Sequence, residues 1–428
     1  MMNLNEALDF IQSICWLGTH PGLGRITDLL HRLGDPHKDL KFVHITGTNG
    51  KGSVAAMVTA TLNAAGLNVG RFTSPHLRYY NERINVAGQD VSDEDICRLA
   101  ELIKPAAEAM EEKPSEFEIW TAMAMCYFKQ RNCDIVVLEV GLGGRLDSTN
   151  VIPAPEVAVI TNLGLEHTEY LGDTIEKIAF EKAGIIKPSV PVVVGEGATE
   201  SNKVFEHMAE MCGSELVYAD REWTVLESEP SSVGVRYTLQ RPRDGRTQIL
   251  DLDLAGGYQR KNILTVRTAV SLLRNHTHLN ISTRALVEGL RSVTASTGLM
   301  GRWHKLHDAP LAVCDTGHNA HGLAEVVKQI GEQTYDKLFV VIGVVSDKDV
   351  DAIVPLMPMD AYYLFTQSSV RRAMPAEELA EVFVREGFKG EVIPTVAEAY
   401  QRALELASAD DMIFVGGSTF IVSDLLAE

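Results

Sequence analysis

The sequence is short of the features that mark secreted, membrane-bound and disordered proteins. It has six cysteines in 428 residues, with no C-x-x-C pair and no zinc-like spacing, which excludes a disulfide scaffold and a zinc module. No apolar run approaches 18 residues, and no basic stretch followed by an apolar core opens the chain. Apolar residues make up 45% and charged residues 23%, a globular composition. We therefore expect a cytoplasmic protein without a membrane anchor, whose thiols are reduced and mostly buried.

Positive charge is also scarce. The 39 lysines and arginines face 58 aspartates and glutamates, which gives a formal net charge of −19. A broad basic surface for nucleic acid or anionic lipid is therefore not expected, and a polyanionic ligand would have to be held in a local site. We predict small-molecule partners, no nucleic-acid or membrane partner, and a monomeric chain.

Short β-branched runs alternate with helix-length segments, which predicts an α/β fold with a parallel sheet. The run 133–140 is almost wholly apolar, so we expect it to be a central strand covered on both faces. A small β annex is expected between 201 and 254, around the polar turn Asp244-Gly245. The other strands of this first series are expected at 41–46, 68–73, 157–161 and 190–194.

A second α/β series follows a stretch rich in Ser, Thr and Gly at 292–301, which predicts a linker. Five strands in about 120 residues suit a compact Rossmann-like domain. We therefore divide the chain into an amino-terminal domain, 1–296, and a carboxy-terminal domain, 297–428. The strands of the second domain are expected at 311–314, 338–344, 361–365, 391–393 and 412–415.

A glycine-rich loop between the first strand and a helix predicts a phosphate site. Backbone N–H groups, a helix N-terminus and the Lys51 ammonium converge there, as a polyphosphate requires. Lys51 can bridge β- and γ-phosphates, and a hydroxyl such as that of Ser53 can reach Mg²⁺. Ile45 and Gly52 depart from the strict Walker pattern, so a tight strand–helix turn is the alternative. The residues expected to bind ATP here are Gly47, Thr48, Asn49, Gly50, Lys51, Gly52 and Ser53.

Two other nucleotide-binding classes are disfavoured. The chain has no N-K-x-D run for guanine. The glycine cluster 141–146 has Leu146 where a dinucleotide fingerprint needs its third glycine. Glu139, at the carboxyl end of an apolar strand, could instead hold Mg²⁺ beside the phosphate loop, or face solvent at a strand end.

The order of motifs resembles the dihydrofolate synthase/folylpolyglutamate synthase family, which is related to the muramyl ligases. The resemblance runs from about Arg25 to Gly416-Gly417-Ser418. It implies that ATP phosphorylates a pteroate or folate carboxylate, and that the amine of L-glutamate then displaces phosphate from the acyl phosphate. ATP and Mg²⁺ are the implied cofactors. The motifs are G-T-N-G-K-G-S at 47–53, T-S-P-H-L at 73–77, E-R-I-N at 82–85 and L-E-V-G-L-G-G-R-L-D at 138–147.

The resemblance also implies a metal site and a modified lysine. Ser74 and His167 would join Glu139 as Mg²⁺ ligands, and Lys182 would be carbamylated and act in catalysis with Lys51. From the residues alone, His167 reads as a structural histidine. Lys182 reads as a solvated lysine near the end of a helix, 174–183, that Asp173 caps.

The implied substrate residues fall in both domains. From the residues alone, Glu116 and Glu118 read as a helix N-terminus, Arg302 as part of an inter-domain salt bridge, and Asp315 as a helix N-cap. The resemblance assigns the pterin to Ser115, Glu116, Phe117, Glu118, Leu146, Asp147 and Ser148. It assigns further ATP contacts to Asn262, Arg302 and Asp315, and the glutamate side to His318, which would also be catalytic, Asp347 and Ser418. The first domain would then bind ATP, as the central domain of a muramyl ligase does, and the second would be the glutamate-ligase domain.

The leading hypothesis is a bifunctional dihydrofolate synthase and folylpolyglutamate synthase. The alternatives are the polyglutamylating activity alone and a muramyl-type ligase, against which the motifs at 73–77 and 82–85 argue. A non-catalytic ATP- or folate-binding regulator is a further alternative. It would be expected to lack Lys51 or Glu139, and both are present.

Overall fold

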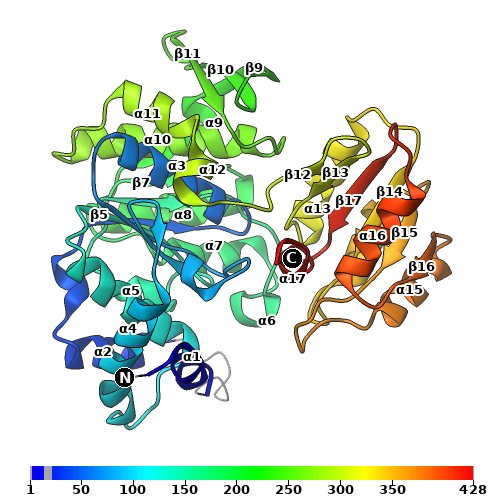
Figure 1. Ribbon diagram of the computed structural model, residues 1–428. Coiled ribbons are helices and arrows are strands. Elements are labelled where there is room, and N and C mark those ends of the chain that lie inside the picture. The colour runs from blue at the N-terminus through cyan, green and yellow to red at the C-terminus, as the bar shows by residue number, and fades with distance from the viewer. Residues whose placement is uncertain (1, 14–21, 428) are drawn as a thin grey trace. The chain divides into compact units, whose positions relative to one another are not determined.

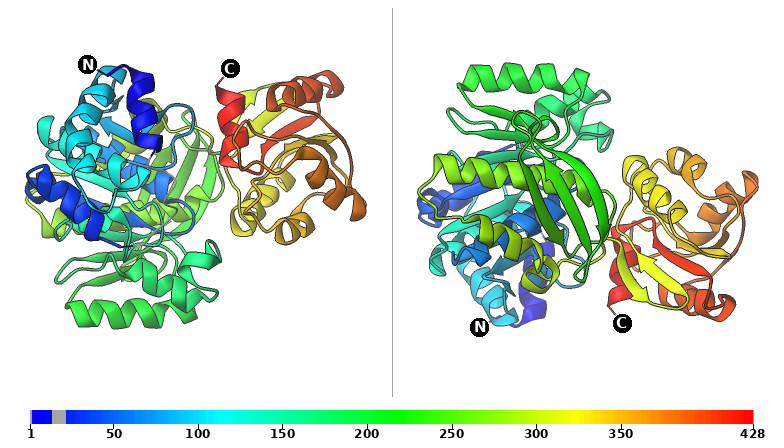
Figure 2. Two further views of the ribbon diagram at one scale, coloured as in Figure 1. Left: turned by 90° about the horizontal axis from the view of Figure 1, so that it is seen from below. Right: turned by 90° about the horizontal axis from the view of Figure 1, so that it is seen from above.

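The computed structural model describes residues 2–13 and 22–427, which form two compact units. The first unit runs to Asp253 and continues from Gln259 to Gly298; the second comprises Leu254–Tyr258 and Leu299–Glu428. Figure 1 and Figure 2 show both units, coloured along the chain. The predicted boundary at 296/297 would leave 254–258 in the first domain, whereas in the structure this short segment belongs to the second unit.

An eight-stranded sheet, of order β4-β3-β2-β5-β1-β6-β7-β8, is the centre of the first unit. Six strands are parallel, and β3 and β4 add an antiparallel edge. As predicted, β5 is central and wholly buried. The strands are β1 (Phe42–Thr46), β2 (Val69–Phe72), β3 (Ile84–Val86), β4 (Gln89–Asp90), β5 (Ile135–Glu139), β6 (Val157–Ile160), β7 (Val192–Val194) and β8 (Leu216–Tyr218).

Helices cover both faces of this sheet because its strands are apolar on both faces. One group, α1, α2, α4 and α5, shares a core with Phe42, Phe72 and Leu138. On the other face, α3 is buried beneath α10, α11 and α12 (Figure 1). The helices are α1 (Leu4–Ser13), α2 (Gly24–Arg32), α3 (Lys51–Ala64), α4 (Asp93–Glu108), α5 (Glu116–Gln130), α6 (Thr168–Leu171), α7 (Ile175–Ala183), α8 (Thr199–Cys212), α9 (Ala219–Glu222), α10 (Gln259–His276), α11 (Thr283–Leu290) and α12 (Val293–Thr297).

The predicted β annex is an antiparallel sheet of order β11-β10-β9. Its strands are β9 (Thr224–Pro230), β10 (Val235–Gln240) and β11 (Thr247–Leu252), and β9 is one that the sequence pattern did not reveal. The sheet lies beside α10 and α11 (Figure 2).

Two local predictions for the first unit were wrong. The stretch 292–301 contains helix α12, whose Val293 and Thr297 are buried, and Arg71 Nη2 donates to Thr297 O at 2.8 Å. Its Ser and Thr residues suggested a linker, yet two residues four apart face the core. Helix α7 is capped by Thr174, whose hydroxyl accepts from Lys177 N, and not by Asp173.

The second unit is a six-stranded sheet of order β12-β13-β17-β14-β15-β16. The five predicted strands are parallel, and β12 adds an antiparallel edge that was not predicted. This confirms the α/β class of both parts of the chain. The elements are β12 (His304–His307), β13 (Leu311–Cys314), α13 (Ala320–Gly331), β14 (Leu338–Ile342), α14 (Val350–Ile353), β15 (Tyr362–Phe365), α15 (Ala376–Arg385), β16 (Lys389–Val392), α16 (Val396–Leu406), β17 (Met412–Gly416) and α17 (Thr419–Leu426).

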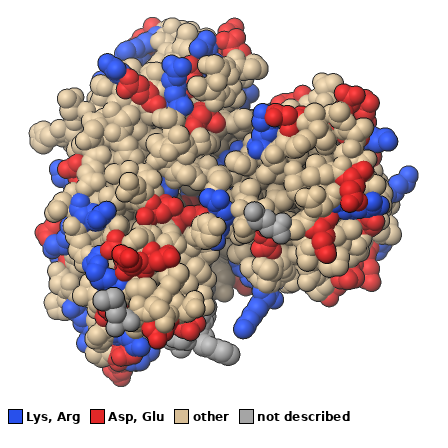
Figure 3. Space-filling model, viewed as in Figure 1, with Lys and Arg blue, Asp and Glu red and all other residues tan. Residues whose placement is uncertain are grey.

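On the face shown in Figure 3, acidic and basic side chains are interspersed among uncharged ones. Within the described residues, no helix combines the length and apolar character that a membrane span requires.

Cys15 lies outside the described residues. The other five cysteines are free thiols, three of them buried and two half-buried.

Candidate active site

The glycine-rich loop leads from β1 into α3 and needs glycine at two positions. Gly47 has φ 149° and Gly50 has φ 84°. A Cβ atom on Gly47 would lie 1.8 Å from Thr161 Oγ1, and one on Gly50 would lie 2.5 Å from Asn262 Oδ1. Space and backbone conformation therefore both exclude a side chain. The backbone N–H groups that begin α3 follow directly at Lys51, as expected for a phosphate loop.

Residues after the neighbouring strand β6 hold this loop in place. Thr48 N donates to Asn162 O at 2.9 Å, and Asn49 N donates to Asn162 Oδ1 at 2.8 Å. Thr161 Oγ1 donates to Asn49 O at 2.6 Å. The Thr48 hydroxyl bonds the backbone of Gly164. Sequence reasoning missed Thr161 and Asn162; their position at the end of a strand next to β1 was the one available signal.

Two lysines converge on one carbonyl oxygen of the loop. Lys51 Nζ donates to Gly47 O at 3.0 Å and to Thr48 O at 3.1 Å, and Lys182 Nζ donates to Gly47 O at 2.8 Å. Lys182 is 3% exposed, which corrects its interpretation as a solvated lysine. Burial and the nearby Lys51 charge lower the pKa of Lys182 to about 7. A large fraction of this side chain is therefore an uncharged amine at neutral pH.

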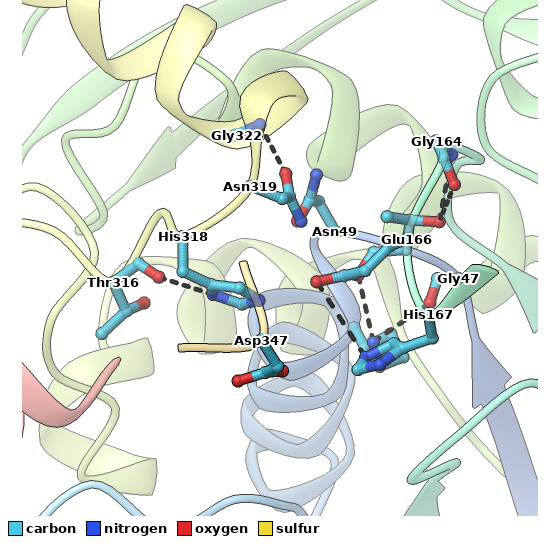
Figure 4. A network of polar contacts seen from close by, with 12 residues as sticks. Gly47, Asn49, Gly164, Glu166, His167, Thr316, His318, Asn319, Gly322 and Asp347 are labelled. Carbon is cyan, nitrogen blue, oxygen red and sulfur yellow. Dashed lines mark hydrogen bonds and ion pairs between the residues drawn. The ribbon is translucent and has the colours of Figure 1, made fainter. Parts of the chain in front are cut away.

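The structure places Ser74 beside Glu139. Glu139 ends β5, is 4% exposed, and its Oε2 accepts from Ser74 N at 3.3 Å. His167 follows β6 with φ 52°, and its Nε2 lies 4.0 Å from Glu166 Oε1 (Figure 4). Within the described part of the chain, no three His, Cys, Asp or Glu side chains are grouped as a ready-made metal site. Carboxylate and hydroxyl oxygens nevertheless fit Mg²⁺, which commonly uses one or two carboxylates together with substrate phosphates.

A pocket at this carboxyl edge of the sheet brings together His167 and the two lysines, Lys51 and Lys182. It opens to solvent, and its space together with that opening is about 270 Å³. Glu166 and Leu171, which sequence reasoning did not select, contribute to its wall. Its lining comprises Thr46, Gly47, Thr48, Lys51, Val140, Gly141, Leu142, Gly143, Glu166, His167, Leu171 and Lys182.

The predicted pterin residues at the start of α5 form a helix cap. Ser115 Oγ accepts from Glu118 N, while Ser115 N donates to Glu118 Oε2 at 2.6 Å. Glu118 is buried and also accepts from Arg25 Nε at 3.0 Å. The interpretation of Glu116 and Glu118 as a helix N-terminus is therefore confirmed: both lie in the first turn of α5, and Ser115 is its N-cap. Glu116 Oε1 lies 3.9 Å from Arg83 Nη2. Phe117 packs closely on Gly141: a Cβ atom on Gly141 would lie 2.6 Å from Cζ of the Phe117 ring.

Asp147 binds the backbone of its own loop. Leu142 N donates to Asp147 Oδ2 at 2.9 Å, and Thr149 N donates to Oδ1 at 3.0 Å. Burial raises the pKa of Asp147, and these hydrogen bonds act in the opposite direction. Its neighbours Leu146 and Ser148 are half-buried and buried. A pterin contact by these three residues stays a prediction.

Asn262 reaches the phosphate loop from α10. Its Nδ2 donates to Gln259 Oε1 at 2.7 Å, and Gln259 Nε2 donates to Ser53 Oγ at 3.1 Å. All three side chains are buried. The amide orientation leaves Asn262 Oδ1 facing Gly50, so the structure brings Asn262 to the predicted ATP site.

Asp315, predicted at the nucleotide, is buried in the second unit. It accepts from Tyr258 OH at 2.6 Å, Trp303 N at 2.7 Å and Gly317 N at 2.8 Å. It caps no helix; Asn319 caps α13 through Gly322 N (Figure 4).

Of the other predicted residues of this unit, three follow the carboxyl ends of β13, β14 and β17, and Arg302 precedes β12. Arg302 donates to Gly301 O and Thr316 Oγ1. His318 Nδ1 lies 3.0 Å from Thr316 O (Figure 4). Asp347 Oδ1 lies 3.8 Å from Arg372 Nη1. Ser418 is the N-cap of α17.

Two domain families match the sequence. The Mur ligase middle domain matches residues 45–270, and the glutamate ligase domain of Mur ligases matches residues 301–419. The chain belongs to the Mur ligase family. This membership confirms the resemblance seen in the motifs and makes the chain an ATP-dependent ligase.

Individual relatives of this Mur ligase chain match it from end to end. A protein of Lacticaseibacillus casei named folylpolyglutamate synthase is 32% identical, over 99% of this chain and 97% of its own. One of Bacillus subtilis, named dihydrofolate synthase/folylpolyglutamate synthase, is 32% identical over 98% and 97%. The structure of Escherichia coli FolC in complex with DHPP and ADP matches with a TM-score of 0.86 and 29% identity, over 99% and 97%. The predicted α/β fold class is thereby confirmed.

Proposed function

We propose that this ligase joins L-glutamate to dihydropteroate and to reduced folates at the expense of ATP. The observation that carries the proposal is the convergence of Lys51 and Lys182 on Gly47 O. Gly47 follows β1, which pairs with the strand that Glu139 ends, and the chain matches a dihydrofolate synthase/folylpolyglutamate synthase over 98% of its length. A carboxylate acylates an amine only once it carries a leaving group. Such a site supplies the positioning and positive charge that phosphoryl transfer to a carboxylate needs.

Lys51 neutralises the phosphates in this proposal, and the loop N–H groups orient them. In the structure Lys51 Nζ bonds loop carbonyls at 3.0 and 3.1 Å, so its ammonium is already held over the loop. Glu139, Ser74 and His167 would hold Mg²⁺. The bound cation would neutralise charge that develops on the transferred phosphoryl group.

Lys182 suits a carbamate, as the family resemblance implies. Carbamylation needs an uncharged amine, and burial lowers the pKa of Lys182 to about 7. The modification would replace an ammonium by an anionic group near the phosphate loop. We propose that this group binds a cation or orients phosphate when ATP is present.

The glutamate side of the reaction belongs to the second unit in this proposal. Ser418 is 2% exposed at the N-terminus of α17, where the helix dipole favours a carboxylate. Thr366 and Ser368, which follow β15, are buried, and their hydroxyls have no hydrogen-bond partner among the described residues. These hydroxyls support an amino-acid site at the carboxyl edge of this sheet, with His318 and Asp347 as further candidates.

A ligase that only extends folates with glutamate is the second candidate, supported by the relative named folylpolyglutamate synthase. Monomeric state and cytoplasmic location remain proposals that rest on the sequence, as do the ATP contacts of Arg302 and Asp315.

Product analysis by mass tests the proposal. The purified protein is incubated with Mg-ATP, L-glutamate and either dihydropteroate or tetrahydrofolate. The expected products are ADP, phosphate and an acceptor heavier by one glutamate residue in both reactions. Ligation of tetrahydrofolate alone would leave the polyglutamylating activity, and ATP binding without ligation of either acceptor would contradict the proposal.

A further inference from the structure

We propose that His44 and Thr149 are positioning residues that hold the pocket-lining loop, residues 140–149, against strand β1. The active-site pocket has two walls that come from different strands. The phosphate loop continues β1, and the pocket-lining loop continues β5. The distance between these walls is set beneath the pocket, by polar side chains of β1 that no other part of the mechanism uses.

The sequence of β1 places two polar residues on one face of a buried strand. His44 and Thr46 are two residues apart, so they point to the same side, and both are 0% exposed. Thr46 Oγ1 donates to Gly143 O at 2.5 Å. His44 Nε2 lies 2.9 Å from Thr149 Oγ1. β1 therefore binds the pocket-lining loop at two points, one near its start and one at its end.

The hydrogen bonds among His44, Thr149 and Asp147 have one consistent donor–acceptor direction. Thr149 Oγ1 donates its single proton to Asp147 Oδ1 at 2.5 Å, so it can only accept from His44 Nε2–H. Burial lowers the pKa of His44 to about 3, which keeps the ring neutral. His44 Nδ1 has no partner among the described residues, as expected when the proton is on Nε2. His44 thus orients the Thr149 hydroxyl, and Thr149 orients Asp147.

Asp147 connects the Thr149 hydroxyl to the wall of the pocket. Its other oxygen accepts from Leu142 N at 2.9 Å, and Leu142 lines the pocket. The next residues of the loop support α7: Arg145 N donates to Glu181 O at 2.8 Å, and a Cβ on Gly144 would lie 3.1 Å from Lys182 O. A shift of this loop would therefore move Leu142, and the last helical turn of α7 with Lys182, relative to Gly47.

Thr149→Val tests the proposal because valine keeps the shape and removes the hydroxyl. The kinetic part rests on the ligase function proposed above. We expect kcat to fall about tenfold with either acceptor, while the KM for ATP stays within twofold, because the phosphate loop keeps its own bonds to Asn162. Thr149→Ser should restore kcat to within twofold of the parent. His44→Leu, which leaves Thr149 bonded to Asp147, should lower kcat about threefold.

Thr61→Val is the matched control. Thr61 is also fully buried, and its hydroxyl donates to Met57 O within α3. A merely structural role for Thr149 predicts that both valine variants lose thermal stability and keep kcat. Equal kcat losses in Thr149→Val and Thr61→Val, or no rescue by serine, would overturn the proposal.

Amide hydrogen exchange decides the question without enzymatic activity. Leu142 N–H should exchange faster in Thr149→Val than in the parent, and at the parental rate in Thr149→Ser and Thr61→Val. Unchanged exchange at Leu142 in Thr149→Val would overturn the proposal. Should the parent show no ligation at all, the proposed function fails, and this measurement still decides whether the loop is held as described. If Thr149→Val does not fold, the same measurement on His44→Leu takes its place.

Discussion

Each unit has a buried aspartate at the carboxyl edge of its sheet, and the two aspartates do different work. Asp147 accepts from Leu142 N, Thr149 N and Thr149 Oγ1, all within eight residues of chain. Asp315 accepts from Tyr258 OH, Trp303 N and Gly317 N, which come from three separate segments. Burial raises the pKa of both. The first aspartate thus shapes one loop beside a pocket, whereas the second joins distant parts of the chain.

The two sheet edges therefore differ in what their buried residues near these aspartates do. The edge of the first sheet carries two lysines that share Gly47 O, and a buried Glu139. At the edge of the second sheet, Asp315 organises backbone by accepting from Trp303 N and Gly317 N, while Ser418 stays a candidate for the glutamate site. Loss of the Lys51 ammonium at the first edge should therefore alter rate with little effect on stability, whereas changes at Asp315 should lower stability.

Lys51→Ala should have the largest effect. Its ammonium faces the position of the phosphates and contacts only loop carbonyls, so we expect kcat to fall on the order of 1,000-fold, with a melting temperature close to that of the parent. ADP release and thermal melts of both proteins measure this. Turnover near the parental rate would remove the phosphate-loop assignment.

Lys182→Met should stabilise the protein at neutral pH while lowering the rate of ligation, by less than Lys51→Ala does. In the unfolded chain Lys182 stays protonated to about pH 10.4, whereas in the folded protein its pKa is lowered to about 7. Between these values the unfolded state binds more protons, so the stability of the parent rises with pH. The full cost of burying the lysine applies below pH 7, where we expect the variant to be more stable by on the order of 3 kcal/mol.

Denaturant titrations of parent and Lys182→Met between pH 6 and 10, in bicarbonate-free buffer, check this prediction. The difference in unfolding free energy should shrink as the pH approaches 10. A difference that is independent of pH would mean that Lys182 keeps an ordinary pKa.

Asp315→Asn should destabilise the second unit by about 2 kcal/mol, because an amide cannot accept at both ends and one backbone N–H loses its partner. Asp147→Asn is the comparison: its loop lies beside a pocket and can open locally, so we expect a smaller loss of stability and a larger loss of kcat. Thermal melts and turnover of the two variants measure both quantities. Equal losses of stability would end the distinction between the two aspartates.

The same contrast explains how much could be predicted from the sequence. The phosphate loop and the parallel strands follow from local patterns, glycine spacing and apolar runs, and they were found. Asn162 was missed because its role depends on which strand pairs with β1. Helix α12 was missed because its Ser and Thr residues suggested a linker, although Val293 and Thr297, four positions apart, are buried. Asp315 is predicted to contact the nucleotide because a carboxylate after a strand is often a ligand, and that contact stays a prediction. Its hydrogen bond with Tyr258, which lies 57 positions away, could not be predicted from local sequence because it depends on the three-dimensional fold.

Tyr258→Phe should have the smallest effect and tests the most specific part of the comparison. The hydroxyl donates to Asp315 Oδ2 at 2.6 Å from the short segment 254–258, whose neighbour Gly257 N bonds Gln329 Oε1 at 2.7 Å. Phenylalanine keeps the ring and leaves Asp315 its two backbone donors, so we expect a loss of about 1 kcal/mol. In the Asp315→Asn background the same change should cost less, because the acceptor is already weakened. A double-mutant cycle by thermal melts measures this coupling. Strictly additive losses would show that Tyr258 and Asp315 act independently, and that segment 254–258 is held to the second unit by Gln329 and packing alone.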